Sequence, residues 1–131
     1  INEVVKNYPN IKFSISGDCN VVADGALNSV IDNLVRNAVV HGGTDKIDFK
    51  INNEERFCVM KVIDYGKGIP EDIKKNIFEE GASFGENKGS GLGLYIVKKV
   101  IERYGGAITI EDNKPSGVIF AVKLRKTYEF S

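Results

Sequence analysis

Apolar residues recur along the chain with two different periods. From residue 27 to 39, and again from about 92 to 104, they are spaced by three and four, which predicts two amphipathic helices. Their expected inward positions are Leu27, Val30, Ile31, Leu34, Val35, Ala38 and Val39, then Ile96, Val97, Val100, Ile101 and Tyr104. Asp24 can cap the first helix, and glycine pairs at 42–43 and 105–106 would end both.

Other apolar runs are shorter and suit strands. Alternating or continuous runs predict strands at residues 11–15, 20–23, 47–51, 57–64, 107–111 and 118–124. A short third helix is expected from Pro70 to about Glu80, with Ile73, Ile77 and Phe78 on its buried side. Two tight hairpins give antiparallel neighbours, whereas helical crossovers give parallel ones. The pattern therefore predicts an α/β (α+β) two-layer sandwich, with a mixed, mostly antiparallel sheet and about three helices on one face.

Composition places the chain among ordinary globular domains. Its 131 residues suit one domain, 1–131, with 42% apolar and 27% charged residues. Basic and acidic residues number 18 each, so no overall charge attracts nucleic acid. No apolar run approaches the ~18 residues of a membrane span. Because the chain begins with Ile1 rather than Met, we expect a fragment of a longer protein.

The chain contains two cysteines, Cys19 and Cys58. They are too few and too far apart for a disulfide framework or a zinc site. We expect both to be reduced thiols, as is usual in the cytoplasm.

A polar stripe runs along the first long helix. Asn33, Asn37 and His41 are spaced by four, so they share one side of the helix beside its apolar face. Asparagine is mildly unfavourable inside a helix. On the residues alone, a solvated edge and a functional site are about equally good interpretations.

A carboxylate follows the most apolar strand. Asp64 ends that strand, and a buried carboxylate needs a partner because unpaired burial costs several kcal/mol. Gly66 and Gly68 follow and would let a ligand approach the backbone closely. The alternative is a plain turn capped by an aspartate.

A glycine-rich loop precedes the last helix. Residues 89–94 (GSGLGL) would present free amides and a positive dipole end, which suits a phosphate, although a flexible hinge is the alternative. The loop lacks the Lys-Ser/Thr ending of a P-loop, and Ile96 stands where a dinucleotide fingerprint needs glycine.

Together, these segments resemble the sequence boxes of the Bergerat-fold (GHKL) ATPases, and most closely those of sensor histidine kinases. DNLVRNAVVHGG resembles the N box, VIDYGKGI the G1 box, IFEEGASF the F box, and GSGLGLYIVKKVIERYGG the G2 box with its helix. The four occur in the family's order between Asp32 and Gly106, and their joint match is far more specific than any single box.

The resemblance implies a domain that binds Mg²⁺ with ATP or ADP and donates the γ-phosphoryl group to a histidine. The acceptor would lie on a dimeric helical-hairpin domain of the same protein, with a response regulator downstream and no nucleic-acid partner. The isolated domain would be a soluble, cytoplasmic monomer with little activity of its own, and the full protein a homodimer. Whether that protein is anchored in a membrane is left open.

The resemblance also assigns roles to single residues. Asp64 would accept a hydrogen bond from the adenine amine, with Gly66 and Gly68 beside the base and sugar. Asn37 would ligate magnesium, Asn33 is the other polar position of the N box, and His41 would pack near the nucleotide. The expected phosphate-side residues are Gly89, Ser90, Gly91, Leu92 and Gly93, with Lys88 from a lid at residues 81–88.

Three positions depart from related patterns. Asn33 stands where hydrolases and serine kinases of the superfamily have a glutamate base, which argues against an anti-sigma-type serine kinase. Val40 replaces a common lysine, and Gly81 replaces the second aromatic residue of the F box. These two leave open a degenerate nucleotide-binding or interaction module.

Overall fold

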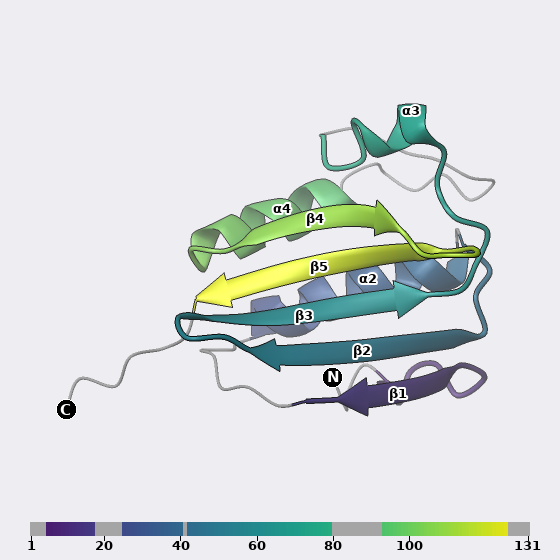
Figure 1. The fold of residues 1–131 in the computed structure, drawn as a ribbon, viewed down its shortest axis with the longest axis horizontal. Helices are drawn as coiled ribbons and strands as arrows, with labels where there is room; N and C mark the ends of the chain where they lie inside the picture. The colour runs from purple at the N-terminus through teal and green to yellow at the C-terminus, as the bar shows by residue number, and fades with distance from the viewer. Residues whose placement is uncertain (1–4, 18–24, 41, 80–92, 126–131) are drawn as a thin grey trace.

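The computed structural model describes residues 5–17, 25–40, 42–79 and 93–125 (Figure 1). Within these ranges the elements are β1 (Lys12–Ser16), α2 (Gly25–Val40), β2 (Lys46–Asn53), β3 (Phe57–Asp64), α3 (Glu71–Lys74), α4 (Gly93–Arg103), β4 (Ala107–Asp112) and β5 (Val118–Arg125). The strands form one sheet in the order β1-β2-β3-β5-β4. β1 pairs with β2 in parallel and the other pairs are antiparallel, so the expected mixed, mostly antiparallel sheet is confirmed.

One face of the sheet is covered by two packed helices, α2 and α4 (Figure 1). Side chains alternate across a strand, so every second residue of the central strands points toward these helices and is buried. The largest fully buried side chains are Phe49, Phe120, Leu34, Ile47, Ile101, Val30, Val35, Val62, Val97 and Val122. The two-layer sandwich is therefore confirmed, with the short α3 lying beyond the edge strand β4 (Figure 1).

Helix α4 buries most of the face that its sequence suggested, with Val100 and Tyr104 half-buried against the core. Leu94, Val97 and Ile101 are buried, but Ile96 is 46% exposed, so its expected inward position is wrong. The three buried residues repeat every three or four positions and define the inward stripe. Ile96 lies about 100° around the helix from Val97, which turns it toward solvent.

Helix α3 is shorter than the expected helix from Pro70 to about Glu80. Pro70 is its N-cap, and after one turn the chain continues in turns whose hydrogen bonds reach back three residues rather than four. The three residues expected on its buried side face the core, Ile77 fully and Ile73 and Phe78 half-buried. Ile77 is 2% exposed, and the ring of Phe78 packs edge-on against Phe120 with 6.1 Å between centroids.

Cys58 lies on the helix-covered face of β3 and is buried. It is disulfide-bonded, so the expectation of a reduced thiol is wrong for this residue. A count of two cysteines excludes a framework of several disulfides but not a single bond. Cys19, the strand expected at residues 20–23 and the cap Asp24 lie outside the described residues. Among the described helices, none has the length and apolarity that crossing a bilayer requires.

Four segments meet at one end of the sheet: the end of α2, the end of β3, the start of α4 and the β4–β5 hairpin (Figure 1). The loop after β3 is docked on the end of α2. The Lys67 amide donates to the Gly42 carbonyl oxygen at 2.9 Å. Gly66 packs so closely that a Cβ there would lie 2.2 Å from the same oxygen. The Tyr65 amide donates to Thr44 Oγ1 at 3.1 Å, so two hydrogen bonds join the loop to the segment after α2.

We expect Gly66→Ala to lower the free energy of unfolding by about 1–3 kcal/mol, the usual cost of overpacking, because the clashing neighbour is a backbone carbonyl. Gly43→Ala is the matched control, since Gly43 has a φ of +67° but no atom within 4 Å of a built Cβ. Its cost should be limited to left-handed strain, roughly 1–2 kcal/mol. Urea denaturation measures both, and a Gly66→Ala cost no larger than the control's would contradict the close docking.

Candidate functional site

Asp64 is the last residue of β3 and is 4% exposed. Its Oδ1 accepts two backbone hydrogen bonds, from the Gly66 amide at 3.0 Å and the Val118 amide at 3.2 Å. Burial raises the pKa of the Asp64 carboxyl above its ordinary value, and these two hydrogen bonds oppose that rise. Among the described residues Oδ2 has no hydrogen-bond partner, so it can accept a donor from a ligand.

The β4–β5 hairpin fixes the main chain of the same residue. Asn113 Nδ2 donates to the Asp64 carbonyl oxygen at 2.8 Å, and the Asn113 amide donates to the Gly117 carbonyl at 3.0 Å. Gly117 has a φ of +109°, and a Cβ there would lie 2.1 Å from the Asp64 carbonyl oxygen. Backbone and side chain of Asp64 are therefore both held by a turn about 50 residues further along the chain.

Sequence reasoning missed Val118, Asn113 and Gly117 as parts of the site. The segment 113–117 lies between two expected strands, and its sequence predicts only a turn. Its one local signal was an asparagine at the start and a glycine at the end, which any hairpin of this kind allows. Nothing near residue 64 in the sequence indicates which distant amides hold its carboxylate.

The polar stripe of α2 divides into two kinds of residue. Asn33 Nδ2 donates to the Ser29 carbonyl oxygen at 2.9 Å, so its amide is engaged on its own helix. Asn37 is half-buried, and its side chain forms no hydrogen bond within the described part of the chain. The Asn37 carbonyl oxygen accepts from the Gly42 amide at 3.3 Å, and the Gly42 carbonyl oxygen accepts from the Lys67 amide. Gly42 therefore links Asn37 to the loop after Asp64. Asp32 faces elsewhere, because its Oδ1 accepts from the Tyr8 hydroxyl at 3.1 Å.

The two glycines after Asp64 have structural reasons of their own. Gly66 leaves room for a carbonyl group of the protein itself, that of Gly42, and not for a ligand. Gly68 has a φ of +79°, a backbone conformation that favours glycine, and its built Cβ meets no atom closer than 3.6 Å. Their expected contacts with a base and sugar stay predictions.

Of the expected phosphate-side residues, Gly93 is the first residue of α4, whose start lies at the Asp64 end of the sheet (Figure 1). His41, Lys88, Gly89, Ser90, Gly91 and Leu92 lie outside the described residues. The expectation that they share one cavity with Asp64 and Asn37 therefore stays a prediction. Within the described ranges, no group of three acidic, histidine or cysteine side chains is placed to hold a metal.

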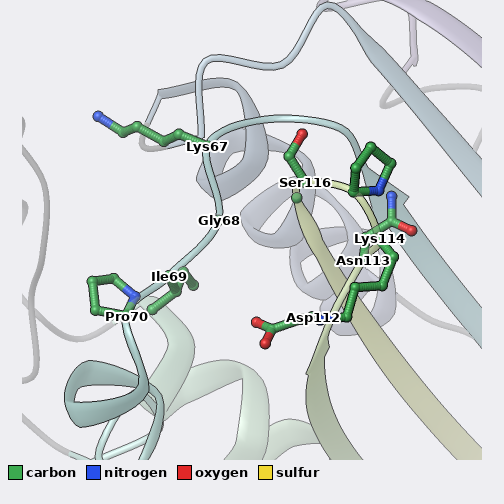
Figure 2. A pocket seen from close by; sticks show the side chains of 10 residues that line it. Lys67, Gly68, Ile69, Pro70, Asp112, Asn113, Lys114 and Ser116 are labelled. Carbon is green, nitrogen blue, oxygen red and sulfur yellow. The ribbon is translucent and has the colours of Figure 1, made fainter.

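Figure 2 shows a cavity beside this site, between the loop after β3 and the β4–β5 hairpin, with a volume of about 360 Å³. Its lining residues are Lys67, Gly68, Ile69, Pro70, Asp112, Asn113, Lys114, Pro115, Ser116 and Gly117. Lys74 Nζ lies 2.9 Å from Asp112 Oδ1 and ties α3 to this rim. Only Gly68 belongs to the expected nucleotide residues, so this cavity is a neighbour of that site.

Comparisons with known proteins agree with this geometry. A family model described as Histidine kinase-, DNA gyrase B-, and HSP90-like ATPase matches residues 23–128. The sensor protein KdpD of Clostridium acetobutylicum is 37% identical over 131 residues, which cover 92% of this chain and 14% of KdpD. The sensor-type histidine kinase PrrB of Mycobacterium leprae is 30% identical over 128 residues, covering 94% of this chain and 29% of PrrB. The chain thus spans less than a third of the length of either relative.

Solved structures give the same result for the fold. The catalytic domain of histidine kinase ThkA superposes with a TM-score of 0.82 at 31% identity, covering 97% of this chain and 92% of that domain. The ATP binding domain of PrrB from Mycobacterium tuberculosis superposes with a TM-score of 0.79 at 23% identity, covering 97% and 88%, which supports the fold alone. The chain therefore belongs to the histidine kinase-, DNA gyrase B- and HSP90-like ATPase family, and its fold is that of the histidine kinase catalytic domains.

Proposed function

We propose that this domain binds ATP with Mg²⁺ and donates the γ-phosphoryl group to a histidine on a helical-hairpin domain of the same protein. ADP is the product, and a response regulator then takes the phosphoryl group. On this proposal the domain works in the cytoplasm as part of a homodimer. The observation that carries it is the buried carboxylate of Asp64, held on one oxygen and available on the other.

Adenine recognition follows from how Asp64 is held. Because Oδ1 is occupied by the amides of Gly66 and Val118, Oδ2 is the oxygen left for the exocyclic amine of adenine. Guanine carries an oxygen at that position, and two acceptors would then face each other without a proton between them. Sites built on a buried acceptor discriminate strongly against a ligand that leaves it unpaired.

The residues present fit a magnesium ion. Asn37 offers an amide oxygen beside the docked loop, and no described side chain competes for it. Magnesium prefers oxygen ligands and is commonly held by one or two protein groups together with phosphate oxygens. When bound, the ion would neutralise charge on the phosphates, while Asn37 fixes where the ion sits.

The class of acceptor follows from what the α2 stripe lacks. Asn33 is an amide tied to the Ser29 carbonyl, and an amide takes no proton in this pH range. The nearby carboxylate of Asp32 is turned to Tyr8. Neither of these residues can therefore act as the base that activates water or a serine hydroxyl. A histidine is already a nucleophile: one neutral imidazole nitrogen attacks the γ-phosphorus while the bond to ADP breaks, and any base that takes the proton from its other nitrogen can come from its own domain. This favours the histidine kinase over the serine kinase.

The test is to fuse the chain to a histidine-bearing helical hairpin and add labelled ATP with magnesium. We expect phosphate that is labile in acid and stable in base. Phosphate on a serine would contradict the proposal, and nucleotide binding without transfer would support the degenerate module instead. Asn37→Asp should change the magnesium concentration needed for transfer more than the affinity for adenine, because on this proposal that side chain would ligate the metal and not the base. An unchanged magnesium dependence would make Asn37 structural.

Asp64→Asn separates recognition from stability. The amides of Gly66 and Val118 would hold the new Oδ1, so the amide nitrogen would face the adenine amine, donor against donor. Calorimetry should show ATP affinity falling roughly 10²-fold, with little left of the preference for ATP over GTP. Asp72→Asn, at an exposed carboxylate, is the matched control.

The same variant should be more stable at neutral pH. The pKa of Asp64 is raised in the folded protein above 3.8, so the folded state pays for a buried charge only at pH values above that raised pKa. Removing the charge should raise the free energy of unfolding at pH 7, and the gain should shrink as the pH falls toward 3.8. A variant that loses stability at pH 7 yet keeps ATP affinity would contradict this assignment of Asp64.

A further inference from the structure

We propose that the face of the sheet opposite α2 and α4 is a docking surface for an acidic surface of another protein. In the described part of the chain no helix covers this face (Figure 1). Alternation and register place six basic residues on it: Lys12, Lys46, Lys50, Lys61, Lys123 and Arg125. We call this surface the basic face. Alternation places only two acidic residues there, so this face has a net positive charge although the chain as a whole has none.

The register puts like charges directly opposite each other. Lys50 on β2 pairs with Lys61 on the central strand β3, and Lys12 on β1 pairs with Lys46. Lys61 is half-buried. Like charges directly opposite in a sheet are destabilising, so this arrangement lowers the stability of the free domain. An anionic partner would turn the same charges into a source of binding energy.

Acidic residues of the domain do not neutralise the basic face. None of its six basic residues forms a salt bridge within the described ranges. Asp48 and Glu111 are the acidic residues that alternation places there. Asp48 Oδ2 accepts from the Tyr65 hydroxyl, and its Oδ1 is buried without a hydrogen-bond partner among the described residues. Glu111 lies on the edge strand β4, away from the lysines of β2.

Apolar residues between the lysines favour a protein partner over nucleic acid or lipid headgroups. Ile63 is buried, and half-buried Phe57, Val59, Ile119 and Ala121 lie on the same face. Lysine stems are laid over this surface, with Lys123 Nζ 4.3 Å from the centre of the Phe57 ring and Lys46 Nζ 4.9 Å from that of Tyr65. Phosphate groups would contact the basic side chains but leave the aliphatic side chains without apolar contacts, and aliphatic side chains do not stack on bases. An apolar protein surface with carboxylates at its rim would contact both the basic and the aliphatic side chains.

The test is a titration of the isotope-labelled domain with a glutamate-rich amphipathic helical peptide, followed by NMR. We expect the largest shifts on the basic face, and a Lys50→Gln/Lys61→Gln variant should bind about three- to tenfold more weakly. Lys75→Gln/Lys98→Gln removes the same charge at exposed positions off this face and should bind as the wild type does. Equal loss in both variants, or tighter binding of duplex DNA or phosphatidylserine vesicles than of the peptide, would overturn the proposal.

A second measurement tests whether Lys50 stabilises the domain itself. Because Lys50 and Lys61 repel each other, Lys50→Gln alone should raise the midpoint of thermal unfolding by a few degrees, with a smaller gain at high salt. A lower midpoint would mean that Lys50 stabilises the domain itself, and would count against a face reserved for a partner.

Discussion

The structure depends on one buried carboxylate, that of Asp64. Taking a charge out of water costs several kcal/mol unless hydrogen bonds replace the lost hydration. Here two backbone amides do so, and each comes from a different part of the chain: Gly66 from the loop that follows β3, and Val118 from the start of β5. Both amides can reach one oxygen only if the loop and the hairpin adopt their particular turns. The positive φ angles of Gly68 and Gly117 provide those turns.

On the proposed function, the carboxylate of Asp64 also couples local stability to adenine recognition. Its raised pKa indicates that two amides do not fully repay the cost of burial, so the folded domain is less stable than it would be with a neutral group there. A bound adenine would supply the donor that the free Oδ2 lacks. Strain of this kind is expected where a site is prepared for a ligand, because a fully satisfied carboxylate would have nothing left to offer.

The sequence predicted most of the fold because each element has its own period of apolar residues. The expected bounds of β3, residues 57–64, are those of the structure, and five residues of the expected apolar stripe of α2 are buried: Val30, Ile31, Leu34, Val35 and Ala38. The errors lie where tertiary packing decides. Ile96 is turned outward because it lies about 100° around α4 from the buried Val97, and α3 is cut short by tighter turns. The need of Asp64 for a partner could be inferred locally. Its actual partners, Val118 and Asn113, could not, because their contacts span about 50 residues of chain.

Strand β3 connects the candidate site to the basic face. Its even-numbered residues face the helices and end in Asp64, while Lys61 and Ile63 point to the other side. Tyr65 follows the carboxylate directly. Its amide binds Thr44 beside the end of α2, and its hydroxyl binds Asp48 on the basic face. A protein docked on that face would therefore contact the residue next to Asp64. Contact with Tyr65 acts on the loop after β3, whose position is fixed by the packing of Gly66 on Gly42. This loop therefore links the candidate site to the basic face.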